Sequence, residues 1–318
     1  MEKKSKEEQK VRTMLLRRGA VLLLFLGVLG FAVTVCLSTD KTAERKALYH
    51  YETRRDLSVY FGNADIVIED IRAALRRRQE RIVISYSSHS DNMKDLGIIA
   101  DELFEYALSE TAEPDEGDYM RYQIGGYDLD YSYEEADGEY SYRLVLTPDY
   151  YSEPEEEQKV DEAVRDIIES FGFDSQTGDY EKIKAVFDWV CKNVRYDPVK
   201  SRLGSSHYKS SAYGALFYKN AVCQGYSVLM YRLLRECGIS CRIVTGIAER
   251  EGESELHAWN IAELDGRYYN IDASWCSQLG TEDYFLKSDE DMEGHTKDEK
   301  FLTEEFCEDF QISKVSYR

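Results

Sequence analysis

The sequence predicts an α+β protein whose folded domains follow a single apolar N-terminal segment. Three observations support this prediction: an uncharged run at residues 19–37, two strand-like runs around an Asp-Gly turn at residues 265–266, and a helical pattern that follows Cys223 and ends at Gly238. Alternating apolar residues indicate strands, whereas apolar spacings of three and four indicate helices. We therefore expect a cysteine-bearing helix packed on an antiparallel sheet in the C-terminal half.

Composition and charge restrict the classes of partner. The 318 residues suffice for one large or two modest domains, and a hydrophobic fraction of 43% can build their cores. Residues 1–18 carry a net charge of +4, so the remaining 300 residues carry −25 of the total of −21. A body this acidic repels phosphate backbones, which argues against nucleic acid as a partner. The charge also keeps an exported domain soluble without any binding role.

The N-terminus has the features of a signal anchor. Residues 1–18 form a basic cytoplasmic segment, and residues 19–38 are long and apolar enough to form a transmembrane anchor. The basic flank predicts a single-pass protein of the cell membrane, with its N-terminus in the cytoplasm and its C-terminal domains extracellular. A cleaved signal peptide is the alternative.

The middle of the chain divides into a linker and a small domain. Residues 39–60 are charged and lack a clear period, which suits a juxtamembrane linker, and residues 61–151 form a predicted membrane-proximal α/β domain. Within it, residues 81–88 predict a strand and residues 91–110 a helix. Alternating tyrosines on both sides of Asp137-Gly138 predict a hairpin. Cross-strand packing accounts for these rings, and a platform for sugar rings is the alternative.

A second domain is expected over residues 152–318. Pro154 followed by three glutamates is a good helix start, and a second helix is expected over about 180–194. No cysteine pair has CxxC spacing and no HExxH occurs, so we expect no metal and no cofactor. The acidic loop at 289–294 imitates half of a calcium site, but its twelfth position is Lys300 instead of glutamate.

Cys223 occupies a position that suits a nucleophile. The sequence AVCQGY places it at the start of the amphipathic helix, where the helix dipole and unpaired N–H groups stabilise a thiolate. The same N–H groups could donate to a developing oxyanion. A nucleophile also needs a base.

A base can be located by counting along the C-terminal hairpin. LHAWNIAEL and RYYNIDASW flank Asp265-Gly266, and pairing Leu264 with Arg267 places His257 opposite Ser274. The same register places Trp259 opposite Asp272. His257 and Asp272 then lie on one face as diagonal neighbours, about 7 to 8 Å apart at the backbone. In this hypothesis Cys223 attacks an amide carbonyl, His257 takes and returns the proton, and Asp272 orients the imidazole.

These motifs resemble a known family. The stretch SAYGALFYKNAVCQGYSVLMYRLLRECGISCRIVTGIA and then HAWNIAELDGRYYNIDASW look like the transglutaminase-like superfamily, in a membrane-anchored bacterial form, with a papain-like core. The resemblance covers residues 180–290 most strongly. It implies a catalytic triad of Cys223, His257 and Asp272.

The resemblance implies cysteine-dependent acyl transfer or hydrolysis of peptide or protein amides through a thioester at the cell envelope, with water or an amine as acceptor. Phe217 stands where papain-type enzymes have an oxyanion glutamine. Tyr213 and Gln224 are therefore the candidate donors to the oxyanion, and Trp259 is a candidate wall of the cleft. A non-catalytic envelope binding or scaffold module with a vestigial triad is the alternative.

Overall fold

The protein was analysed as a computed structural model, in which residues 57–197 and 207–318 are described. The chain forms two compact units, which are treated separately below. The first comprises residues 57–109 and 124–150, and the second comprises residues 110–123 and 151–318. The predicted segments at 1–18 and 19–38, with most of the linker at 39–60, lie outside the described residues. Within the described residues, no helix has both the length and the apolar character to cross a bilayer.

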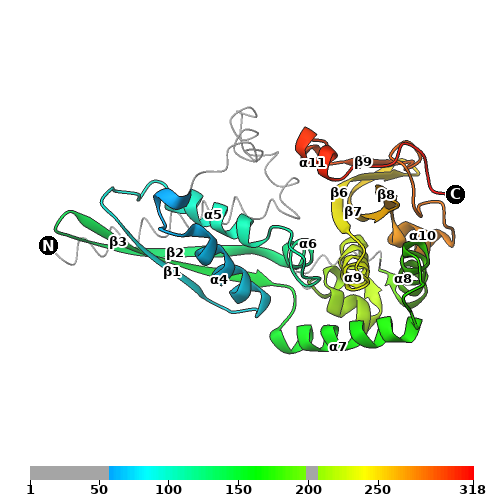
Figure 1. Ribbon diagram of the computed structural model, residues 1–318, viewed down its shortest axis with the longest axis horizontal. Helices are drawn as coiled ribbons and strands as arrows, with labels where there is room; N and C mark the ends of the chain where they lie inside the picture. The colour runs from blue at the N-terminus through cyan, green and yellow to red at the C-terminus, as the bar shows by residue number, and fades with distance from the viewer. Residues whose placement is uncertain (1–56, 198–206) are drawn as a thin grey trace. The chain divides into compact units, whose positions relative to one another are not determined.

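The first unit is a three-stranded antiparallel sheet with two helices on one face (Figure 1). Its strands follow the order β1-β3-β2. The elements are η1 (Leu57–Val59), α4 (Ala64–Arg76), β1 (Ile82–Ser88), α5 (Leu96–Ala107), β2 (Ile124–Ala136) and β3 (Glu139–Tyr150). The predicted strand, helix and hairpin are confirmed, and Asp137 and Gly138 both have positive φ, as a tight hairpin turn requires.

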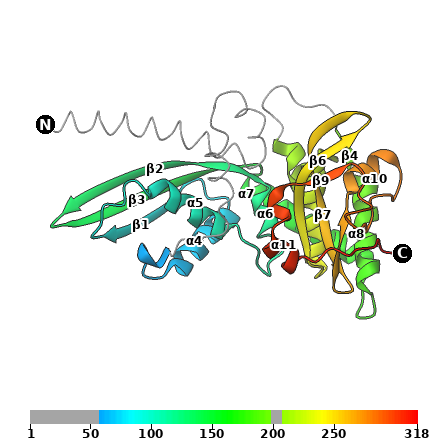
Figure 2. The same ribbon diagram turned by 90° about the horizontal axis from the view of Figure 1, so that it is seen from above.

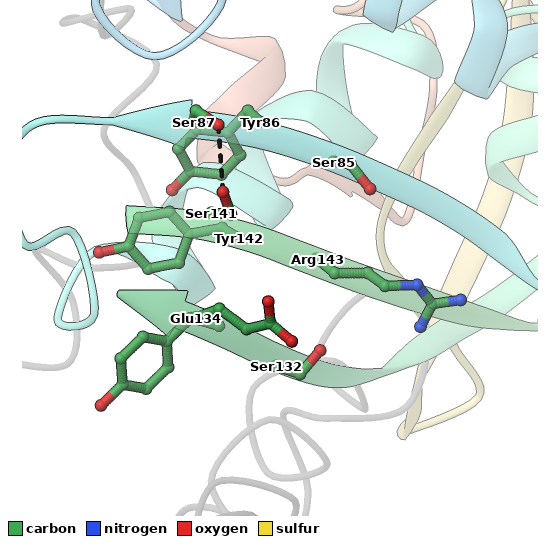
Figure 3. Close-up of a pocket in the computed structure, with 9 residues that line it drawn as sticks. Ser85, Tyr86, Ser87, Ser132, Glu134, Ser141, Tyr142 and Arg143 are labelled. Atoms are coloured by element: carbon green, nitrogen blue, oxygen red, sulfur yellow. Dashed lines mark hydrogen bonds between the residues drawn. The ribbon is translucent and has the colours of Figure 1, made fainter. Parts of the chain in front are cut away.

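The two faces of this sheet differ in chemistry. Tyr86 and Tyr142 are buried and stack with ring centroids 5.0 Å apart, so cross-strand packing accounts for the core of the tyrosine stripe. The opposite, exposed face has a shallow pocket in which serines predominate. There Ser87 and Ser141 lie within hydrogen-bond distance, beside Arg143 (Figure 3).

The second unit contains most of the helices among the described residues. They are α6 (Asp118–Arg121), α7 (Pro154–Phe171), α8 (Asp179–Asn193), α9 (Cys223–Glu236), α10 (Ala273–Leu279) and α11 (Glu304–Asp309), with short turns η2 (His207–Ser210), η3 (Gly214–Tyr218) and η4 (Glu299–Phe301). Pro154 begins α7 as predicted, and Glu153 with Glu156 forms a capping box before it. Helix α9 is buried along nearly its whole length, and α8 and α10 lie beside it (Figure 1).

The sheet of the second unit has the order β8-β7-β6-β9 and is antiparallel throughout. Its strands are β6 (Cys241–Arg250), β7 (Glu253–Leu264), β8 (Arg267–Ile271) and β9 (His295–Lys297), and a separate parallel pair is formed by β4 (Arg195–Tyr196) and β5 (Asn220–Ala221). Ala258 and Ala262 of β7 belong to the main core together with α9, whereas Trp259 and Ile261 belong to a second cluster.

Residues 110–123 group with the second unit because a buried polar cluster holds them there. Asp118 is 1% exposed, and its carboxylate accepts hydrogen bonds from Arg242 Nε and Ile243 N, both at 2.8 Å. Glu110 accepts from the Asp118 backbone N–H at 2.7 Å and from the Tyr231 hydroxyl at 2.7 Å. Burial and the nearby Asp118 charge raise the pKa of Glu110 to about 7.

Glu110 predicts a pH-dependent stability. Its folded pKa lies above the usual 4.5, so the folded state favours the protonated acid, and stability falls as pH rises from about 4.5 to about 7. Glu110→Gln removes this contribution. Chemical denaturation should show that the free energy of unfolding falls less between pH 5 and pH 7.5 in this variant than in the wild type. Glu162→Gln, at an exposed position on α7, is the control. Equal losses in Glu110→Gln and the wild type would contradict the assignment.

Gly225 predicts a steric requirement in the first turn of α9. A Cβ there would lie 2.3 Å from the Lys209 carbonyl oxygen and 2.9 Å from Ala221 Cβ. Gly225→Ala should therefore destabilise the protein by about 1–3 kcal/mol. Gly97→Ala in α5 meets nothing within 4 Å and should stabilise it by up to about 1 kcal/mol. Thermal unfolding of both variants distinguishes steric conflict from a general effect of the added methyl group.

Candidate active site

The cysteine lies at the first position of helix α9. Val222 is the N-cap and offers no side-chain hydrogen bond, and the Tyr226 N–H donates to the Val222 carbonyl at 3.2 Å. The N–H groups of the residues between them therefore precede the first intrahelical bond. The Cys223 thiol is half-buried and free. Cys223 therefore lies at the positively polarised end of the helix.

The histidine is positioned by the hairpin that the sequence predicted. The pairs Leu264–Arg267 and Asn260–Ile271 confirm the counted register. The prediction that this register extends to residues 272 and 274 is wrong, because β8 ends at Ile271. Asp272 instead becomes the N-cap of α10. The change of backbone direction still leaves the Asp272 carboxylate next to the His257 ring.

Asp272 uses its two oxygens for different purposes. Oδ1 accepts from the Ser274 N–H at 2.9 Å, the Ser274 hydroxyl at 2.7 Å and the Trp275 N–H at 3.0 Å, which caps α10. Oδ2 lies 2.8 Å from His257 Nε2. Burial would raise the pKa of Asp272, but the charges and hydrogen bonds of His257 and His295 outweigh it and hold that pKa far below its usual value. The carboxylate is therefore ionised.

His257 faces Asp272 on one side and Cys223 on the other. Its Nε2 is held by the carboxylate, so Nδ1 is the ring nitrogen left to interact with the sulfur. Among the described residues, Nδ1 is buried and makes no hydrogen bond of normal geometry. Burial lowers the pKa of His257, but Asp272 and Cys223 outweigh this and raise the pKa well above 6.5. The ring can accept and hold a proton.

A hydrogen bond from a side chain of β7 to the backbone of α9 fixes the strand relative to the helix. Asn260 Nδ2 of β7 donates to the Ser227 carbonyl of α9 at 3.0 Å. Cys223 lies one helical turn before Ser227, and His257 lies three residues before Asn260. The strand and the helix therefore bring both reactive side chains to the same end of the domain.

The three further candidates are placed differently. Gln224 is buried, and its amide donates to the Tyr122 carbonyl at 2.5 Å. This hydrogen bond ties the Gln224 side chain to the backbone at Tyr122. The Tyr213 ring packs on Phe217, with centroids 4.7 Å apart. The Trp259 ring stacks beside the His257 ring, with centroids 6.2 Å apart. Its indole N–H donates to Asn270 Oδ1 at 3.0 Å.

Two neighbours of the site were not anticipated from the sequence. Tyr196 of β4 is close enough to Cys223 for the two groups to influence each other electrostatically. His295 Nε2 lies 3.0 Å from Asp272 Oδ2. His295 begins a three-residue strand after an acidic loop, which is too short to show an alternating pattern. Its only sequence signal is that the chain has just five histidines.

The six described cysteines are free thiols. Cys237 and Cys241 form no bridge with each other. Cys191 is half-buried, and its thiol donates to the Ala273 carbonyl at 3.5 Å. Burial raises the pKa of Cys191 to about 12.

This arrangement defines a class of protein: an α+β domain in which a helix-borne cysteine, a strand histidine and a capping aspartate lie together. Residues 170–273 of this domain match the family model of the transglutaminase-like superfamily.

Two curated proteins are similar to this chain. The kyphoscoliosis peptidase of Homo sapiens is 28% identical over 138 residues, which are 41% of this chain and 20% of that protein. The Mus musculus protein of the same name is 29% identical over 109 residues, which are 32% and 16% of the two chains. The chain therefore spans a fifth or less of these relatives. A solved structure described as a TGase is 21% identical, with a TM-score of 0.34 over 47% of this chain and 44% of that one.

Asp272→Asn tests the charge on the capping residue. Asparagine keeps an oxygen to cap α10 but removes the negative charge, so the pKa of His257 should fall below 6.5 as burial dominates. In the wild type the raised pKa means that the charged ring adds stability below about pH 6.5, which is lost as pH rises through the folded pKa. NMR titration of the His257 ring measures this shift.

Asp309→Asn, at an exposed position on α11, is the matched control and should leave the titration unchanged. An unaltered His257 titration in Asp272→Asn would contradict the role assigned to the carboxylate.

Proposed function

We propose that this domain catalyses acyl transfer from peptide or protein amides through a thioester on Cys223. The observation that supports it best is the central position of His257, which interacts with Asp272 through Nε2 and has Nδ1 left for Cys223. The match of residues 170–273 to the transglutaminase-like superfamily adds support, as does the similarity to two proteins named kyphoscoliosis peptidase.

The first half-reaction forms the thioester. His257 Nδ1 takes the thiol proton as the sulfur attacks the amide carbonyl, and a carbon–sulfur bond forms. The N–H groups at the start of α9 stabilise the negative oxygen of the tetrahedral intermediate. The imidazolium then gives its proton to the departing amine, and the carbon–nitrogen bond breaks. Asp272 keeps the ring oriented and stabilises its charge throughout.

The second half-reaction breaks the thioester and regenerates the free enzyme. His257 takes a proton from water or from an incoming amine, which attacks the thioester carbonyl. The carbon–sulfur bond breaks, and the proton returns to the sulfur. Water gives hydrolysis or deamidation, and a lysine amine gives an isopeptide crosslink.

The location is part of the same proposal. The uncharged run at residues 19–37 and its basic flank support a membrane anchor that leaves the catalytic domain outside the cytoplasm. Its substrates would then be peptides or proteins of the cell envelope. Protease digestion of intact cells tests this part. Protection of the C-terminal domains from added protease would contradict it.

Thiol alkylation tests the nucleophile without knowledge of the substrate. At pH 6, iodoacetamide should modify Cys223 faster than the exposed Cys307, because a thiolate stabilised by His257 reacts and a thiol does not. His257→Ala should slow the alkylation of Cys223 by at least about tenfold and leave the alkylation rate of Cys307 unchanged. Peptide mass spectrometry measures both sites in one sample.

His89→Ala, at an exposed position in the first unit, is the control. Equal and slow labelling of Cys223 in the wild type and His257→Ala would contradict the catalytic proposal and favour a scaffold. If the enzyme is active, mass analysis of envelope peptides distinguishes an isopeptide bond, a deamidation and a cut. Envelope peptides from cells with the Cys223→Ala variant, which lacks the proposed nucleophile, provide the control for this comparison.

A further inference from the structure

The carboxylate oxygen that holds His257 also holds a second imidazole. His295 Nε2 lies 3.0 Å from Asp272 Oδ2, and His257 Nε2 lies 2.8 Å from the same atom. The side chains of all three residues are 1% exposed or less. Two ring nitrogens therefore converge on one buried oxygen.

The sheet brings His295 to this point across two small residues of β6. Strand β9 lies beside β6 in both views (Figures 1 and 2), and His295 pairs with Ala248. His257 pairs with Gly246 from the other side of β6. Gly246 and Ala248 share a face, so both histidines project on that face, and their ring centroids are 5.4 Å apart.

Glycines make this approach feasible. A Cβ on Gly246 would lie 2.0 Å from the Thr296 carbonyl oxygen, which shows how closely β9 approaches β6. Gly294 has φ +78°, and a Cβ there would lie 2.5 Å from the Glu249 carbonyl oxygen. Larger residues at either position would push His295 away from Asp272.

The partners of His295 determine how many protons its ring needs. Nδ1 lies 3.1 Å from the Glu293 carbonyl oxygen, which can only accept a hydrogen bond. Nε2 faces Asp272 Oδ2, which also only accepts when the carboxylate is ionised. A ring that satisfies both contacts has a proton on each nitrogen, and is therefore a cation.

The surroundings of His295 suit a cation. Three aromatic rings lie close to it, with centroid distances of 5.1 Å to Trp259, 4.4 Å to Trp275 and 5.3 Å to Tyr284. Aromatic rings attract cations through their quadrupoles, most strongly where water is excluded. Within the described ranges, the titratable side chains that contact His295 are Asp272 from the start of α10, His257 from β7 and Tyr284 from the loop after α10.

A metal ion is the competing explanation, because the ligand atoms of His257, Asp272 and His295 all lie within 4.8 Å of one another. Two ligands 2.0–2.1 Å from a tetrahedral zinc ion lie about 3.3 Å apart. The observed nitrogen–oxygen distances of 2.8 and 3.0 Å are those of hydrogen bonds. The geometry thus favours protons between these atoms.

We propose that His295 is a positioning residue, held as an imidazolium, that shares Asp272 with His257 and sets the pH range in which His257 exchanges its proton. This inference rests on the proposed function. A positive charge 5.4 Å from the His257 ring opposes a second proton there and offsets part of the attraction of Asp272. His257 can then return its proton to the leaving amine instead of retaining it.

His295→Gln tests the charge, because glutamine can keep a hydrogen bond to Asp272 but is neutral. NMR titration of histidine-labelled full chain should show His257 titrating about one to two pH units higher in the variant. A merely structural loss would loosen the site and move the titration down towards 6.5. An unchanged or lowered value would overturn the proposal. His89→Gln is the control.

Two measurements on the wild type keep the test independent of the variant's folding. At pH 7 both ring nitrogens of His295 should show the ¹⁵N shifts of protonated nitrogens, and a neutral ring would overturn the proposal. EDTA should leave the His257 titration unchanged, and a shift on chelation would assign the site to a metal. Failure of the proposed function is seen separately, as slow alkylation of Cys223 while the histidine titrations remain as described.

Discussion

The second unit depends most on the interactions of the Asp272 carboxylate. One oxygen caps α10 through three hydrogen bonds, and the other oxygen orients His257 and His295. The capping bonds form as the helix folds, so the charge is held in place before any substrate arrives. Such preorganisation is what makes a buried charge effective, because no further rearrangement is needed during the reaction.

Much of this domain can be predicted from local sequence rules. The Asp265-Gly266 turn sets the register of β7 and β8, so counting alone gives the strand pairs from Leu264–Arg267 to Asn260–Ile271. The start of α9 can also be predicted, because Cys223 precedes an amphipathic run. In both cases a short stretch of chain contains all the information that the prediction needs.

The unpredicted features arise from contacts between distant segments. A helix cap ends β8 at Ile271, and the competition between cap and strand is decided by the hydrogen bonds of Ser274 and Trp275. His295 reaches the site only because β9 pairs with β6 across Gly246. Likewise, Gln224 is a plausible oxyanion donor by position, yet it donates to the backbone of Tyr122, about a hundred residues away in sequence.

The double use of Asp272 affects how related sequences should be compared. A descendant that loses its chemistry still needs an acceptor at this position to begin α10, so selection for folding alone preserves the aspartate. Retention of Asp272 therefore says little about turnover. Cys223 has no comparable structural duty, since its helix starts without a side-chain cap. Its presence or loss is the better marker for separating working enzymes from silent homologues.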